Sequence, residues 1–180
     1  MKNVLNKTYR GFTIIEVMIV LAIAGLIMVI VFFAIPQLQR NQRDNARQSL
    51  TTRIKSEVET YASNNQGTYP YSTAGNWNSF YTRYIFGPSL NVKDPSLGTD
   101  VIGPASGNPA TFTIVACNGT CGNVTLPPTK GVFVIAAGAK CSGEDVVRSG
   151  GSGAANLDTK NYAMIIGLDK DNTRYCVDNG

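Results

Sequence analysis

The sequence predicts an α+β fold in which a long N-terminal helix packs on an antiparallel sheet of about four strands. Three features predict it: an apolar run, an amphipathic continuation of that run, and four strand-like runs further along the chain. We therefore expect four parts: a basic leader at 1–11, an apolar half-helix at 12–35, an amphipathic half-helix at 36–64 and a globular head at 65–180.

The apolar run, Phe12 to Ile35, is long enough to cross a membrane. Its uncharged part, Val17 to Ile35, covers about 28 Å, close to the hydrocarbon thickness of a bilayer. A soluble helix would have a polar face, which this segment lacks. A cleaved secretory signal is the main competitor, because Ala22-Ile-Ala24 fits a small-x-small cleavage pattern. Cutting there would leave an apolar tail without a partner, so we favour a membrane span.

Glu16 is the charged residue inside this run. A carboxylate deep in a membrane span costs about 2.5–3.5 kcal/mol. Reaching back to the lipid headgroups would lower this cost but would not explain why a carboxylate is there. Lys and Arg are absent between Arg10 and Arg40, so a positive partner must come from elsewhere. A new N-terminal amine at Phe12 would supply it.

The stretch Arg10-Gly11-Phe12-Thr13-Ile14-Ile15-Glu16-Val17 resembles the processing signature of type IV prepilins and the related pseudopilins. The resemblance implies that a prepilin peptidase cuts after Gly11 and that Phe12 is then N-methylated. It also implies that Glu16 pairs with the Phe12 amine of a neighbouring subunit. Pairing two desolvated charges would offset the cost of each.

The resemblance further implies a structural subunit of a type IV pilus, not an enzyme. The subunit would be stored in the membrane and polymerise into a homo-oligomeric helical filament for adhesion, twitching motility or DNA uptake. Its partners would be the peptidase, a platform protein, a motor ATPase and minor pilins. A pseudopilin of a type II secretion or competence machine is the alternative. The resemblance also implies that Gly25 and Pro36 let the helix stretch or bend. Pro36 lies slightly later in the chain than the proline that is usual in pilins.

The charge distribution argues against a basic binding surface. The formal net charge is +4, from 16 basic and 12 acidic residues, but three of the basic residues lie in the leader. The chain has no histidine, which excludes Ser-His-Asp triads and histidine metal sites, and we expect no cofactor and no metal. Aromatic residues near Arg83 leave DNA contact open, but such clusters more often pack a loop onto a sheet.

Arginines also follow the span. Arg40, Arg43 and Arg47 match the leader's three positive charges, so the positive-inside rule scarcely chooses an orientation. We choose a cytoplasmic leader and an extracytoplasmic head, because the resemblance requires it and the cysteines favour it. The three arginines share one helix face, which we interpret as solvated surface; contact with lipid phosphates or a neighbouring subunit is the alternative.

Residue periodicity predicts the amphipathic half-helix and the strands. The expected buried stripe is Ala46, Leu50, Ile54, Val58 and Ala62. A short helix over Trp77–Phe86 would be capped by Asn76. Strands are expected at 111–117, 131–137, 162–168 and 173–177. The segment from Asp169 to Asn172 should be the turn of the last hairpin, with a Ca²⁺ loop as the less favoured alternative.

Four cysteines permit two disulfides with three possible connectivities: Cys117, Cys121, Cys141 and Cys176. We favour Cys117–Cys121 and Cys141–Cys176. The second pair would close a C-terminal loop like the one that pilins often staple. A zinc site is a poor alternative, because the chain has one close cysteine pair and no histidine.

Overall fold

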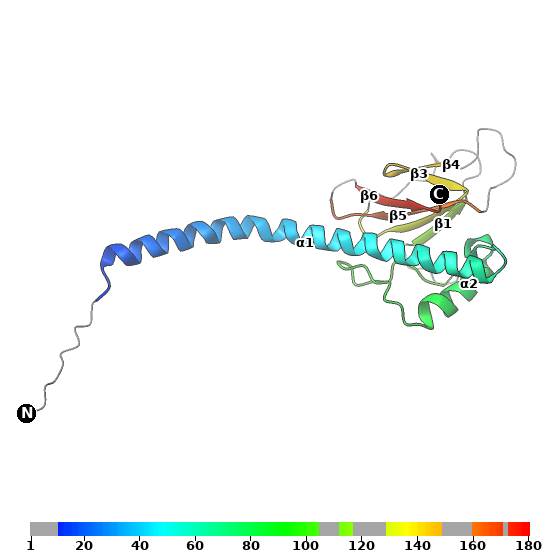
Figure 1. Ribbon diagram of the computed structural model, residues 1–180, viewed down its shortest axis with the longest axis horizontal. Helices are drawn as coiled ribbons and strands as arrows, with labels where there is room; N and C mark the ends of the chain where they lie inside the picture. Colours follow the sequence, from blue (N-terminus) through cyan, green and yellow to red (C-terminus); the bar gives the residue numbers. More distant parts are fainter. Residues whose placement is uncertain (1–10, 105–111, 117–128, 149–159, 171–172) are drawn as a thin grey trace, which may run out of the picture. The chain divides into compact units, whose positions relative to one another are not determined.

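The computed structural model describes residues 11–104, 112–116, 129–148, 160–170 and 173–180 (Figure 1). The chain divides into two compact units, Met1–Gln39 and Arg40–Gly180, and each is described by itself. One helix, α1 (Ile14–Asn64), passes from the first unit into the second. The expectation of a single long helix is therefore confirmed.

In the second unit, α1 buries one face against the head. The buried residues are Arg47, Leu50, Thr51, Ile54, Val58, Tyr61 and Ala62. Ala46, expected on this face, is instead exposed. A repeat of exactly four residues drifts around a helix of 3.6 residues per turn, so the two ends of such a stripe cannot share one face. The buried face instead follows alternating steps of three and four residues.

Short helical elements follow α1. They are a 3₁₀ turn, η1 (Pro70–Ser72), then α2 (Ala74–Phe80), then a π-helical segment, η2 (Tyr81–Phe86). The residue that caps α2 is Thr73 and not Asn76: the Thr73 hydroxyl accepts a hydrogen bond from the Asn76 backbone N–H at 3.1 Å. A threonine three residues ahead of a backbone N–H is a typical N-cap, so the helix simply begins one turn earlier than predicted.

The main sheet has four strands in the order β1-β2-β5-β6. They are β1 (Phe112–Ala116), β2 (Phe133–Ala137), β5 (Tyr162–Gly167) and β6 (Arg174–Asp178), close to the four predicted runs. The sheet is mixed and not antiparallel throughout as expected: β1 pairs with β2 in parallel, and the other neighbours are antiparallel. A parallel pair needs a connection of a dozen or more residues, and the segment 117–132 is long enough for one.

A second sheet was not expected from the sequence. It contains β3 (Ala139–Ser142) and β4 (Asp145–Arg148), which form an antiparallel hairpin. Its turn contains Gly143 with φ of +66°, a conformation that glycine adopts without steric cost. The α+β class and the four-stranded sheet are confirmed, with this hairpin as an addition.

The core has a larger and a smaller cluster. In the larger one, Leu50, Ile54 and Val58 of α1 pack with the aromatic segment 77–85 and with one face of the main sheet. The smaller cluster joins the main sheet to the hairpin and contains Ala136, Ala139, Val146, Ala163 and Ile165. Strands β2 and β5 are buried along their whole length, as expected for strands covered on both faces.

Candidate assembly site

The proposed processing site lies at the start of α1. Gly11, Phe12 and Thr13 precede the helix, and the Phe12 side chain is 83% exposed. The Glu16 backbone N–H donates to the Thr13 carbonyl at 3.2 Å and lies 3.4 Å from the Thr13 hydroxyl. Glu16 is the acidic residue of the first helical turn, where a negative charge is favoured by the positive end of the helix dipole.

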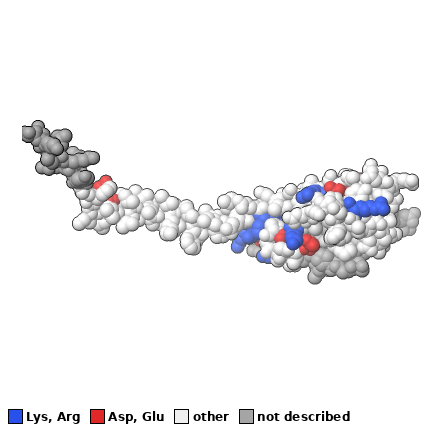
Figure 2. Space-filling model, turned by 90° about the horizontal axis from the view of Figure 1, so that it is seen from below, with Lys and Arg blue, Asp and Glu red and all other residues white. Residues whose placement is uncertain are grey.

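Glu16 has no cationic partner among the residues that the structure describes. No Lys or Arg lies between Gly11 and Gln39. Figure 2 shows the same pattern on the surface: the first half of α1 carries acidic colour near its start and no basic colour. Within Gly11–Gln39, therefore, the Glu16 carboxylate has no side-chain cation to neutralise it.

The side chains around Glu16 are apolar and unburied. The exposed large residues include Ile14, Ile15, Met18, Leu21 and Phe32. By length and composition, the helix that begins at Ile14 is apolar enough in its first part to cross a membrane, and that part is not buried within the protein. An apolar surface of this length needs lipid or other protein to cover it.

Residues 6–32 match the family described as the prokaryotic N-terminal methylation motif. The chain carries a prepilin signature. Gly11, Phe12, Glu16 and Gly25 lie inside the matched range, and Pro36 lies beyond it. No curated protein and no solved structure matches the chain.

The signature makes the chain type IV pilin- or pseudopilin-like and indicates a structural subunit rather than an enzyme. Together with the apolar helix, it indicates membrane anchoring. The two predicted flexibility positions both lie within α1. A Cβ added to Gly25 would meet nothing within 4 Å in this chain, and α1 continues through Pro36 although proline cannot donate a backbone hydrogen bond.

The head of this prepilin-like chain contains a buried ionic cluster that sequence reasoning missed. Arg47 is completely buried, so its interpretation as solvated surface is wrong. Its Nε lies 2.7 Å from Asp94 Oδ2, and its Nη1 lies 3.0 Å from Asp44 and 3.2 Å from Asp169. Arg43 also pairs with Asp169. The cluster joins α1 to the loop after η2 and to the turn between β5 and β6.

Electrostatics keep the cluster ionised. Burial opposes the charged form of Arg47, but Asp94 and Asp169 outweigh it and raise the pKa of Arg47 above its usual value. Burial likewise opposes the charge on Asp94, but hydrogen bonds from Arg47, Ser96 and the Leu97 backbone hold its pKa well below 3.8. The pKa of Asp169 is lowered by Arg43 and Arg47 in spite of burial. Asp169 is therefore used in ion pairs, whereas Asp171 and Asn172, the other two residues of the predicted turn or Ca²⁺ loop with ligand oxygens, lie outside the described residues.

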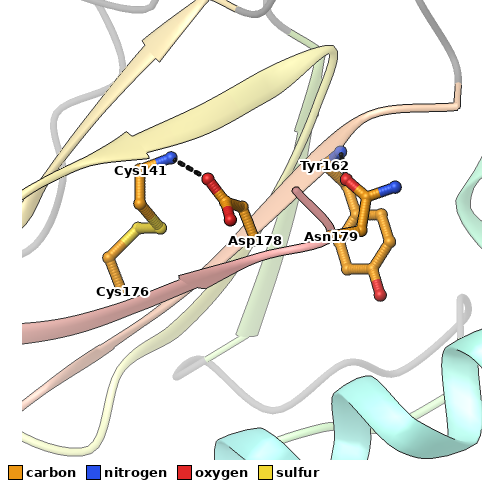
Figure 3. The surroundings of a disulfide bond; sticks show 5 residues. All are labelled: Cys141, Tyr162, Cys176, Asp178 and Asn179. Carbon is orange, nitrogen blue, oxygen red and sulfur yellow. Dashed lines mark hydrogen bonds between the residues drawn. A yellow bond between two sulfur atoms is a disulfide. The ribbon is translucent and has the colours of Figure 1, made fainter.

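A second missed group surrounds Glu59 of α1. The Tyr162 hydroxyl donates to Glu59 Oε1 at 2.5 Å, and the Tyr69 hydroxyl donates to Oε2 at 3.3 Å. Asn179 accepts from the Tyr162 backbone N–H at 3.0 Å (Figure 3). Burial and the Glu59 charge raise the pKa of Tyr162 far above 10. This group connects α1 to β5 and to the segment after β6.

The aromatic segment is mostly structural. Trp77 and Phe80 are completely buried, and the Trp77 indole N–H donates to the Gly103 carbonyl at 2.7 Å. Phe86 is 71% exposed. Buried rings cannot stack on bases, so the packing interpretation fits this segment better than DNA contact does.

Cys141 and Cys176, one of the two pairs favoured from the sequence, form a disulfide between β3 and β6 (Figure 3). The other pair, Cys117 and Cys121, lies outside the described residues. Among the described residues, no cluster of three or more potential metal ligands occurs.

Proposed function

We propose that this chain is a type IV pilin, a subunit that is stored in the membrane and polymerises into a surface filament. In this proposal a prepilin peptidase hydrolyses the bond after Gly11, and the new amine of Phe12 is methylated. The filament would serve adhesion, twitching motility or DNA uptake. The leader would be cytoplasmic and the head extracytoplasmic before assembly.

The observation that carries the proposal is the charge at Glu16. The carboxylate stands on an apolar, uncovered helix whose unit contains no cation from Gly11 to Gln39. Cutting after Gly11 would place an ammonium group four residues before it in every copy. In a bundle of such helices, the amine of one copy would neutralise Glu16 of the next and set the axial register of the two subunits.

The energetics of assembly follow from the same surface. A bilayer and a filament core are both apolar, so moving the helix between them yields little hydrophobic free energy. Methylation leaves the Phe12 amine positively charged, so the ion pair survives the modification. Extraction from the membrane therefore requires work, which supports a motor ATPase and a platform protein as partners. Minor pilins would be further partners at the filament.

The test is the N-terminus of the exported chain. Peptide mass spectrometry should find N-methylated phenylalanine at position 12 as the first residue. A chain that still begins at Met1, or one cut elsewhere, would exclude the proposal. Gly11→Val serves as a matched variant, because a β-branched side chain at the cut should leave the leader attached.

A pseudopilin is the alternative function. The disulfide in the head favours the surface pilin, since a short periplasmic piston has less need for a covalently braced exterior. Electron microscopy of sheared surface filaments, followed by peptide identification, separates the two. Long filaments that contain this chain support the pilin, whereas loss of secretion without filaments supports the pseudopilin.

A further inference from the structure

The β3–β4 hairpin covers the face of the main sheet that α1 does not cover. Side chains alternate along each strand, so Phe133 and Ile135 of β2 belong to the helix-side cluster, whereas Ala136 belongs to the other. In β5, Met164 joins the helix side in the same way. The hairpin supplies Ala139 and Val146 to the second cluster, and Figure 1 shows it on the side of the sheet away from α1.

The hairpin is fastened to the edge strand β6 at three points. Cys141 forms the disulfide with Cys176. The Cys141 backbone N–H donates to Asp178 Oδ2 at 2.7 Å (Figure 3). Arg174 pairs with Asp145 of β4 at 3.1 Å.

These three fastenings use one face of β6. Arg174, Cys176 and Asp178 alternate along the strand, and the residues between them pack on the helix side. Two of the fastenings are weak on their own. The Asp145 side chain is 68% exposed, so solvent screens its ion pair with Arg174 and little stability comes from it. A single hydrogen bond also contributes little net stability, because the unfolded chain forms it with water.

The hairpin has little stability of its own. It contains two strands of four residues each, and an isolated two-stranded hairpin is at best marginally stable in water. The cluster beneath it is also small, since three of its five fully packed members are alanines. The four-stranded sheet, in contrast, is held by α1 and the larger cluster, which do not involve the hairpin.

We propose that the β3–β4 hairpin is a redox-locked cover over the second face of the main sheet. Reduction of the disulfide opens this cover while α1 and the main sheet stay folded. A dithiol donates two electrons and two protons, becomes a disulfide itself, and leaves Cys141 and Cys176 as free thiols. The opened hairpin uncovers the apolar face that includes Ala163 and Ile165. The proposal does not depend on the function proposed above.

Hydrogen exchange read by mass spectrometry tests this, with the full chain in detergent micelles. The oxidised chain is compared with the chain treated with dithiothreitol and with a Cys141→Ala/Cys176→Ala variant. We expect amides of 139–148 to exchange at least about tenfold faster after reduction, because the hairpin then lacks its main fastening. Amides of 50–62 and 162–167 should keep their protection.

A matched control separates this disulfide from the other two cysteines. Cys117→Ala/Cys121→Ala, kept oxidised, should protect 139–148 as the unaltered chain does. Trypsin gives an independent readout: cleavage after Lys140 in β3 should become fast only when Cys141 and Cys176 are reduced or replaced.

Three results would overturn the proposal. Unchanged protection of 139–148 after reduction would mean that packing alone holds the hairpin. Equal loss of protection in 50–62 and 162–167 would mean that the disulfide supports the whole head. An open hairpin in the oxidised Cys117→Ala/Cys121→Ala control would assign the effect to a different part of the chain.

Discussion

Arg47 and Asp94 form a bidentate ion pair inside the head, and both side chains are fully buried. Nε of Arg47 lies 2.7 Å from Oδ2 of Asp94, and Nη2 lies 3.1 Å from Oδ1. Ser96 completes the arrangement, since its hydroxyl accepts from Arg47 and donates to Asp94. All buried polar side-chain atoms of the described residues have partners, so the pair is fully satisfied.

Arg47→Met should lower the free energy of unfolding by about 3–5 kcal/mol, because it leaves Asp94 buried without its counter-charge. Arg53→Met is the control: Arg53 is exposed on the same helix, and its loss should change stability by less than about 0.5 kcal/mol. Denaturant titration of the full chain in micelles measures both. If both substitutions changed the free energy of unfolding equally, the buried position of Arg47 would not explain its contribution to stability.

Stability should fall in acid. The folded-state pKa values of Asp94 and Asp169 are lowered from 3.8, so the unfolded chain binds protons first as the pH falls. Their contribution is fully present above about pH 5 and is lost progressively below the ordinary pKa of 3.8. Melting temperatures between pH 2.5 and 7 measure this. Asp94→Asn should be less stable than the unaltered chain at neutral pH, and its melting temperature should fall less as the pH is lowered. An unchanged dependence of the melting temperature on pH would show that Asp94 does not contribute to the loss of stability in acid.

Tyr162 should give the opposite dependence at high pH. Its pKa is raised in the folded head, so the unfolded chain loses the phenol proton first, and this contribution declines as the pH rises above 10. Tyr162→Phe should cost about 1.5–3 kcal/mol at neutral pH, through loss of a hydrogen bond to a carboxylate. The same variant should lose less stability than the unaltered chain between pH 9 and 11. If the two proteins lost the same stability between pH 9 and 11, the Tyr162 hydroxyl would not be the cause of the alkaline dependence.

Gly167 should tolerate no side chain. A Cβ there would lie 2.1 Å from the Thr129 carbonyl oxygen, which belongs to the backbone and cannot turn aside. Gly167→Ala should therefore destabilise the head by about 1–3 kcal/mol or more. Gly75→Ala is the control, because its nearest neighbour would be 3.9 Å away and alanine favours the helix. Thermal unfolding should separate the two variants; similar melting temperatures would mean that β5 can shift.

Glu16→Ala should leave cleavage after Gly11 intact and reduce filament yield, since the proposed ion pair acts between subunits and not at the peptidase. Glu16→Asp is the matched variant, because it keeps the charge on a shorter side chain and should restore part of the yield. Immunoblots of cell and sheared-filament fractions measure processing and assembly separately. Full filament yield from Glu16→Ala would remove the basis of the proposed pairing.

The sequence predicted the elements better than the connections between them. Local periodicity located α1 and the four strands of the main sheet, because the second half of α1 and each strand place apolar side chains in the core at helical or strand spacing. The parallel pairing of β1 with β2 depends on a crossover that leaves no local pattern. The β3–β4 hairpin is short and carries Lys140 and Asp145, so its hydrophobic signal is weak.

The ionic cluster had a signal that was available but not used. Arg47 stands three and four residues before Leu50 and Thr51, on the face that Ile54 continues. An arginine on a buried face requires a carboxylate, and Asp94 is the acid before a proline in the following loop. Glu59 left no such trace, because its partner Tyr162 is 103 residues away and either residue is ordinary on a surface.

The continuity of α1 has a mechanical consequence. It runs as one helix from Ile14 to Asn64, lacking the backbone hydrogen bond that Pro36 cannot donate, so tension applied to the apolar end would be transmitted along the helix axis into the head. The first helix side chains bonded to other elements after Arg40 belong to Arg43, Asp44 and Arg47. Charged pairs would therefore bear a pulling force before the aliphatic contacts that begin at Leu50. Added salt should then weaken the half-exposed pair of Arg43 more than the buried pair of Arg47 with Asp94, because solvent ions screen only charges that they can approach.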